Sequence, residues 1–270
     1  MNEKGSEERW RKTHKVLASC VFTQKHILIQ NVRDFRYPSG VEDKPEERFI
    51  DMEFTEDDVM SAWVAIIPFR PHFAHLITSF ELRDGRYVAI SIEIRYREGE
   101  PYILWKTFIP HYWLSYIIAT EDDVFRIRTD VRSNEPLHLY KLALTKAEAG
   151  ALCLDMLTRA EVVKHGKPER FNSAVNSCTS NVLTHLKKCT NKKLPWSRAH
   201  YLTDRLDPYL MKHGFITPDG SFTDGLRSIH CINDIARTIP PDAPDFSLRI
   251  RRAIGYSFIF SVNSLIQLRS

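Results

Sequence analysis

The sequence lacks several features that would assign it to a specialised class of protein. None of its apolar stretches reaches the roughly 18 uninterrupted residues that indicate a transmembrane helix. Residues 1–9 are charged and contain no apolar run, which predicts that the chain carries no signal peptide. Lysines and arginines are scattered among acidic residues, and with a formal net charge of only +4 we expect no nucleic-acid partner.

The five cysteines also lack a pattern. They are odd in number, widely spaced and contain no Cys-X-X-Cys pair, which argues against both a disulfide framework and a zinc site. His72 and His75 are three residues apart on a predicted strand and would point to opposite faces, so we expect no metal and no other cofactor. What remains is a chain of 270 residues, 43% of them hydrophobic, that can bury a large core.

Hydrophobic patterns predict short strands followed by helices. Strands are expected at residues 26–32, 49–52, 62–68, 114–119, 124–128 and 137–140, and helices at 198–213 and 224–238, which prolines at 240–244 end. The run from Ala62 to Pro68 is apolar on both faces, which is typical of a central strand, and we expect the proline to end it. Thr145 and Glu148 form a capping box that opens a helix with an apolar inner stripe between residues 149 and 160. Residues 253–268 are apolar but interrupted, which favours a core or surface-docking element over a membrane span.

The segment from Phe73 to Ile94 is the clearest hairpin, and its register follows from polarity. A two-residue turn at Asp84-Gly85 would mix polar and apolar residues on each face of the hairpin. A three-residue loop at 83–85, with Gly85 in the left-handed conformation, separates them. This register places His75 across from Glu93, with β-carbons roughly 5 Å apart. The alternative is an ordinary contact between a histidine and a glutamate on a half-exposed strand pair.

A polar loop at residues 171–177 leads into a predicted helix that begins near Cys178. Asn176 or Ser177 can cap its first turn with a side-chain oxygen. Cys178, Val182 and Leu186 are spaced to share a buried face of this helix. A cysteine in the first turn lies at the positive end of the helix dipole, which lowers the pKa of its thiol. The alternative is a small core residue, because cysteines are commonly buried without a chemical role.

Cys178, His75 and Glu93 can together supply a nucleophile, a base and a group that orients the base. The amides of the first helical turn are the natural donors to an oxyanion. Further candidates for contact with a substrate or an oxyanion are Asn176, Ser177, Thr179, Ser79, Ser91 and Arg95. A histidine strand that precedes the cysteine helix is the chain order found in permuted papain-like folds.

Several separated motifs keep their order over roughly residues 25–190. They are Asn31-Val32-Arg33-Asp34-Phe35-Arg36-Tyr37, Ala74-His75-Leu76-Ile77-Thr78-Ser79-Phe80, Ser91-Ile92-Glu93-Ile94-Arg95 with Glu98-Gly99-Glu100, Asp122-Asp123-Val124-Phe125-Arg126-Ile127-Arg128-Thr129, Leu139-Tyr140, and Phe171-Asn172 with Asn176-Ser177-Cys178-Thr179-Ser180-Asn181. No single motif is specific, but with the ordered set the sequence resembles the Lnb N-terminal periplasmic domain family.

The resemblance implies a fold of the α+β class: a circularly permuted, papain-like antiparallel sheet with the cysteine-bearing helix packed on it, followed by C-terminal helices. It implies that His75 and Cys178 correspond to the catalytic pair of the family. We accordingly expect a lead-in segment at residues 1–20, a papain-like catalytic domain at 21–195, and a helical extension at 196–270 packed on the same domain.

The best-understood branch of the family is similar to a bacterial lipoprotein N-acyltransferase. The resemblance therefore implies acyl transfer through a thioester, from a phospholipid or other acyl donor to an amine or peptide acceptor, with contact to a membrane surface. A thiol peptidase or amidase, a lipid hydrolase, and a non-catalytic binding domain are the alternatives. The family's doubled asparagine before the cysteine is Asn176-Ser177 here. The family implies a periplasmic location, whereas the expected absence of an export signal fits a cytoplasmic or a trimmed chain.

Overall fold

The computed structural model describes residues 9–24, 26–132, 135–217 and 224–255. The strands are β1 (Ser19–Phe22), β2 (Ile27–Arg33), β3 (Phe49–Phe54), β4 (Val59–Arg70), β5 (Phe73–Leu82), β6 (Tyr87–Arg95), β7 (Trp113–Ala119) and β8 (His138–Lys141). The helices are α1 (Lys12–Lys15), α2 (Glu121–Arg126), α3 (Lys146–His165), α4 (Cys178–Cys189), α5 (Leu206–Lys212), α6 (Asp224–Ile229), α7 (Asn233–Thr238) and α8 (Phe246–Ala253). Short helical turns are η1 (Glu56–Asp58), η2 (Leu104–Phe108), η3 (Ile127–Val131), η4 (Arg198–His200) and η5 (Thr203–Arg205).

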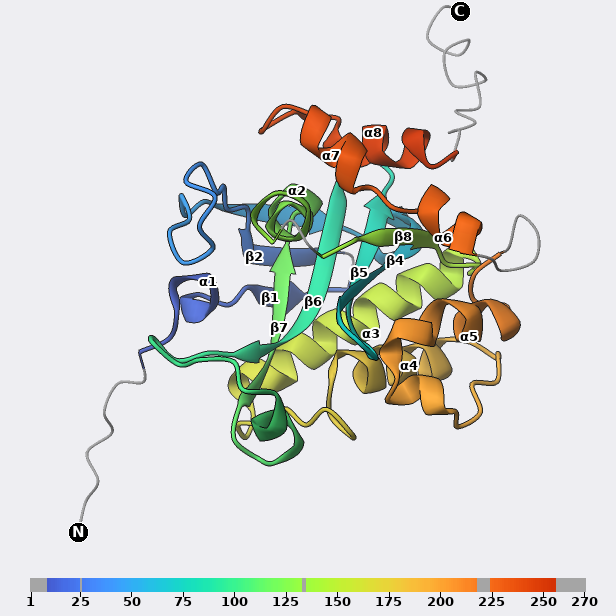
Figure 1. Cartoon of the computed structure of the whole chain (residues 1–270). Coiled ribbons are helices and arrows are strands. Elements are labelled where there is room, and N and C mark those ends of the chain that lie inside the picture. The colour runs from blue at the N-terminus through green and yellow to red at the C-terminus, as the bar shows by residue number, and fades with distance from the viewer. Residues whose placement is uncertain (1–8, 25, 133–134, 218–223, 256–270) are drawn as a thin grey trace, which may run out of the picture.

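The strands form one open sheet in the order β1-β2-β7-β6-β5-β4-β8, with β3 paired to β2. Most neighbouring strands are antiparallel, and the parallel pair of β2 and β7 joins the two halves of the sheet. Helices α3 and α4 lie on one side of this sheet and α7 and α8 on the other (Figure 1). The chain therefore has the predicted α+β architecture with a mostly antiparallel sheet.

Strand β4 is a central strand, as its apolar sequence predicts. Val64 and Ile66 pack on the side of α3 and α4, whereas Trp63 and Ile67 pack on the side of α7 and α8. The prediction that Pro68 ends this strand is wrong, because β4 continues to Arg70. Strand β8 pairs only with residues 63–66 of β4, so this edge of β4 is unpaired at Pro68. Proline has no amide hydrogen to donate and is therefore tolerated at this position.

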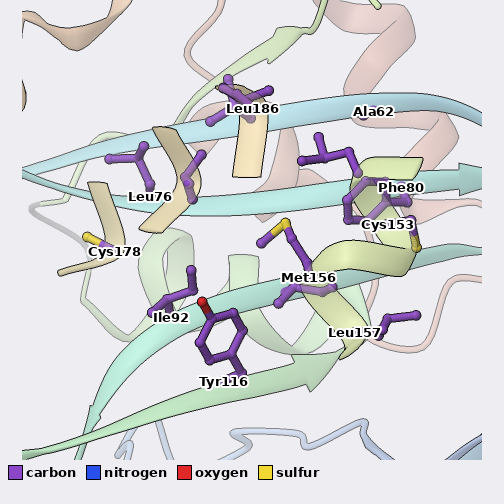
Figure 2. Packing of buried hydrophobic residues seen from close by; sticks show 14 of the residues in the cluster. Ala62, Leu76, Phe80, Ile92, Tyr116, Cys153, Met156, Leu157, Cys178 and Leu186 are labelled. Atoms are coloured by element: carbon purple, nitrogen blue, oxygen red, sulfur yellow. The ribbon is translucent and has the colours of Figure 1, made fainter. Parts of the chain in front are cut away.

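The paired part of the β5–β6 hairpin has the predicted register, but the expected strand pair of His75 with Glu93 does not form, because the pairing ends at Ile77 and Ser91. Glu81 pairs with Tyr87, Ser79 with Ala89 and Ile77 with Ser91. Gly85 has a φ of +85° and donates its amide to the carbonyl of Leu82 at 2.9 Å, which closes the three-residue loop. The face that carries Leu76, Phe80, Val88 and Ile92 forms the core beneath α3 and α4, as Figure 2 shows in part.

The predicted strand at residues 124–128 is wrong, because these residues form the end of α2 and the start of η3. The hydroxyl of Thr120 caps α2 by accepting the amide of Asp123 at 3.3 Å. The carboxylate of Asp123 then receives Nε of Arg33 at 2.8 Å and is fully buried. In this short segment the two arginines are buried along with the apolar residues, so no helical period is visible and the pattern resembles that of a strand.

Several other expectations have mixed outcomes. The capping box of Thr145 and Glu148 opens α3, and the predicted inner stripe of this helix is buried. The region 198–213 is divided into η4, η5 and α5, and a further helix, α8, follows the prolines at 240–244. Residues 256–268 of the predicted C-terminal element lie outside the described residues. Among the helices that are described, none combines the length and apolarity needed to cross a membrane.

Candidate active site

Helix α4 begins at Cys178, where the sequence predicts a capped first turn. Ser177 is the cap: its hydroxyl accepts the amide of Ser180 at 3.3 Å, and the Ser180 hydroxyl accepts the amide of Ser177 at 2.8 Å. Asn176 is not the cap, since its side-chain amide donates to the carbonyl of Arg170 at 3.0 Å and shapes the loop instead. Cys178 is 8% exposed and lies at the margin of the core near Leu76 (Figure 2).

The sheet divides where α4 meets it. The pairing of β5 with β6 ends at Ile77 and Ser91, although β5 continues along β4 to Phe73 and β6 continues along β7 to Arg95. Beyond the last pair, the amide of Leu76 is not paired with β6, and its proximity helps to lower the pKa of the Cys178 thiol. Helix α4 packs against both strands, so Cys178 lies near the point where β5 and β6 part.

His75 and Glu93 face each other across this division. Nε2 of His75 lies 2.8 Å from the Ser91 hydroxyl, which donates to Oε1 of Glu93 at 2.6 Å. The direct separation of His75 Nε2 and Glu93 Oε1 is 3.6 Å. Because Ser91 and Glu93 lie beside Nε2, Nδ1 is the ring nitrogen left to interact with Cys178. The predicted trio thus converges, with Ser91 as a bridge within it.

The electrostatics of this trio favour a thiolate beside an imidazolium. Burial by itself raises the pKa of Cys178, but the hydrogen bond and the charge of His75 outweigh burial and lower it. Burial lowers the pKa of His75, but its hydrogen bonds to Cys178 and Glu93 raise it overall. By contrast, burial raises the pKa of Cys20 to about 12 and that of Cys189 to about 11. Its lowered pKa therefore distinguishes the Cys178 thiol from the thiols of these two cysteines.

Glu93 also contacts a residue that the sequence did not indicate. His14 on α1 is buried, and its Nε2 lies 3.3 Å from Oε2 of Glu93. Burial alone would raise the pKa of Glu93, but hydrogen bonds from His14 and His75 hold it well below its usual range. The expected lead-in segment thus contains a short helix, α1, which places His14 beside Glu93. No local pattern marks His14, which lies 79 residues from its partner.

A cavity of about 460 Å³ opens onto Cys178, His75 and Glu93. Ser177 and Thr179 also line it, together with the aromatic rings of Phe69, Phe73, Tyr96, Tyr102, Phe171 and Tyr201. The thiol lies 4.0 Å from the Thr179 hydroxyl, at the first turn of α4. A ligand in this cavity can reach both the sulfur atom and the amide end of the helix.

Comparison with known protein families gives one match. The model of the Lnb N-terminal periplasmic domain covers residues 47–205, which is more than half of the chain. The chain belongs to this family. Neither a curated protein nor a solved structure shows a significant match. The part that matches the Lnb N-terminal periplasmic domain contains His75, Glu93 and Cys178, whereas His14 precedes it.

Of the six residues predicted to contact a substrate or an oxyanion, Ser177 and Thr179 line the cavity of this Lnb domain, whereas Asn176, Ser91, Ser79 and Arg95 do not. Ser79 shares the sheet face of His75, but its hydroxyl donates to the buried carboxylate of Glu121. Arg95 donates to the carbonyl of His14 at 3.1 Å and so fastens the lead-in segment to β6. Ser79 lies within the predicted hairpin and Arg95 directly follows it on β6, and the neighbouring segments determine what each one contacts.

Proposed function

We propose that the chain is a cysteine enzyme that transfers or hydrolyses acyl groups through a thioester. The observation that supports this proposal is that Cys178, at the start of α4, and His75, held by Ser91 and Glu93, line one cavity that can hold a substrate. A lowered thiol pKa and a raised imidazole pKa favour the ion pair that a thiol nucleophile needs. Glu93 and Ser91 orient the imidazole by occupying Nε2.

In the proposed reaction, the Cys178 thiolate attacks the carbonyl carbon of an ester or amide. The resulting oxyanion receives hydrogen bonds from the first-turn amides of α4. The imidazolium of His75 gives its proton to the leaving oxygen or nitrogen, which leaves an acyl thioester on the sulfur. An amine or water then attacks the thioester while His75 accepts its proton, and collapse of the second tetrahedral intermediate expels the thiolate. An amine completes transfer, whereas water completes hydrolysis.

The fold that we propose for this chemistry is the permuted papain-like arrangement. Its support is that the histidine strand precedes the cysteine helix in the chain and that the helix begins where β5 and β6 part. Family membership supports a phospholipid as the acyl donor and an amine, such as a lipoprotein amino terminus, as the acceptor. On this proposal the protein works at a membrane surface.

Intact mass spectrometry after incubation with p-nitrophenyl hexanoate tests the proposal. We expect an adduct of one hexanoyl group, located at Cys178 by peptide mapping and absent from Cys178→Ala. Cys189→Ala is the matched control, because the pKa of Cys189 is raised, and it should keep the adduct. Full turnover by Cys178→Ala would refute the thioester. Release of amines from peptides without any turnover of phospholipid would instead identify a thiol peptidase or amidase.

A further inference from the structure

Arg128 on η3 is a buried guanidinium that lines the same cavity as the proposed nucleophile. Its side chain is 7% exposed, and it donates from Nη1 to Glu135 at 2.8 Å. Its Nη2 lies 3.7 Å from Oε1 of Glu93. Its Nε is buried and has no hydrogen-bonding partner within the described residues, although the side chain lines the cavity of Cys178. A buried charged donor without an acceptor is unfavourable, so the Arg128 guanidinium would gain from an acceptor that a ligand brings into this cavity.

The cavity carries an excess of positive charge. Four arginines and two glutamates line it: Arg11, Arg70, Arg128, Arg132, Glu93 and Glu135. Arg132 is neutralised from behind by both carboxylate oxygens of Glu42, at 2.6 and 2.7 Å. Arg70 has no acidic partner within the described residues, and its guanidinium lies 5.8 Å from the centre of the Tyr102 ring. The guanidinium of Arg70 and that of Arg128 are therefore the positively charged groups of the cavity that a ligand can use.

We infer that this cavity selects substrates that carry a negatively charged group, a phosphate or a carboxylate, and that Arg128 and Arg70 recognise that group. This inference rests on the proposed function, because it assigns the substrate class of the same cysteine. Arginine suits the task since its donors match the oxygens of phosphates and carboxylates. Arg128 and Arg70 are specificity-determining residues in this scheme, and Cys178 and His75 perform the chemistry.

Two alkylating agents that differ in one charge test the inference. With iodoacetamide or iodoacetate, the Cys178 sulfur forms a bond to the methylene carbon and iodide leaves. We expect the ratio of the iodoacetate rate to the iodoacetamide rate to exceed that of glutathione by at least about ten-fold. Arg128→Gln and Arg70→Gln should each lower this ratio by about ten-fold, whereas Arg86→Gln, an exposed arginine at the hairpin loop, should leave it unchanged.

The outcomes separate the inference from the proposed function. If iodoacetamide reacts with Cys178 no faster than with glutathione, the proposed function fails. If iodoacetamide reacts fast but the ratio is the same in wild type, Arg128→Gln and Arg70→Gln, the inference is overturned and any preference for anions belongs to His75. Because Arg128 is buried, Arg128→Gln can misfold, and the exposed Arg70→Gln then decides the outcome.

Isothermal titration calorimetry identifies the source of the charged group without requiring a reactive thiol. The probes are inorganic phosphate, dihexanoyl phosphatidylglycerol below its micellar concentration, and neutral dihexanoylglycerol. Binding of phosphate and the phospholipid, weakened about ten-fold in Arg70→Gln, supports the inference, and binding of the phospholipid alone assigns the group to a lipid headgroup. Equal binding of the neutral lipid and the phospholipid, or no binding of either anion, overturns the inference.

Discussion

Replacing Glu93 by glutamine tests whether its carboxylate keeps His75 protonated beside Cys178. Oε1 of Glu93 lies 3.6 Å from Nε2 of His75. Two unit charges at that separation attract by about 4.6 kcal/mol at an effective dielectric constant of about 20. That energy corresponds to a shift of at most about 3.4 units in the pKa of His75. Glutamine keeps an oxygen that can still accept the Ser91 hydroxyl, so the substitution removes the charge and retains this hydrogen bond. Since opposite charges at such distances shift pKa values by about 1–3 units, we expect the pKa of His75 to fall by that amount.

The consequence is measurable at the thiol. The fraction of the imidazolium–thiolate pair depends on how far the pKa of His75 lies above that of Cys178. Lowering the pKa of His75 by about 1–3 units favours the neutral thiol and imidazole, so the alkylation rate of Cys178 at pH 6 should fall by about 10- to 1000-fold. The rate should recover as the pH rises into the range of an ordinary thiol. The assay is the rate of iodoacetamide labelling between pH 4 and 10, followed by mass spectrometry of the Cys178 peptide.

Glu135→Gln is the matched control for this experiment. It removes the same charge from the same cavity, but Glu135 contacts Arg128 and not His75. In Glu135→Gln, the fall of the labelling rate toward low pH should stay close to that of the wild type. If Glu93→Gln unfolds normally on heating and its labelling rate at low pH equals that of the wild type, the carboxylate does not set the protonation of His75. If both variants shift equally, the overall charge of the cavity controls the thiol, and the local argument for Glu93 fails.

Three further predictions concern stability and are read from urea unfolding. His14→Ala removes a ring that lies 3.3 Å from Glu93 and should lower the unfolding free energy by about 1–3 kcal/mol; an unchanged value would contradict its placement. Gly85→Val should lower the unfolding free energy by about 1–2 kcal/mol because φ is +85°, whereas Gly85→Asn should lower it much less. Nothing lies within 4 Å of an added β-carbon, so a steric clash would not explain the difference. Equal losses in the two variants would refute the conformational reason. Arg251→Met leaves the buried Glu121 without its partner at 2.6 Å and should cost about 3–5 kcal/mol, part of which the double variant with Glu121→Gln should recover.

The sequence determined those parts of the molecule whose cause lies within one contiguous stretch. The register of β5 and β6 follows from the polarity of the hairpin, since a slip of one residue would exchange its two faces. The start of α4 at Cys178 follows from the hydroxyl of Ser177, which satisfies an amide three residues ahead. With these two elements, the convergence of His75, Glu93 and Cys178 could be anticipated, although the bridging position of Ser91 could not.

Only the tertiary structure decided what each remaining side chain contacts. The separation of β5 from β6, which exposes the Leu76 amide to the thiol, depends on how both strands pair with their outer neighbours. His14 reaches Glu93 across 79 residues of chain, and Arg128 reaches the cavity from a segment whose uniform burial hides its helical period. Periodicity and capping report on a residue's own neighbours in sequence, whereas a contact across the fold depends on how separate elements pack.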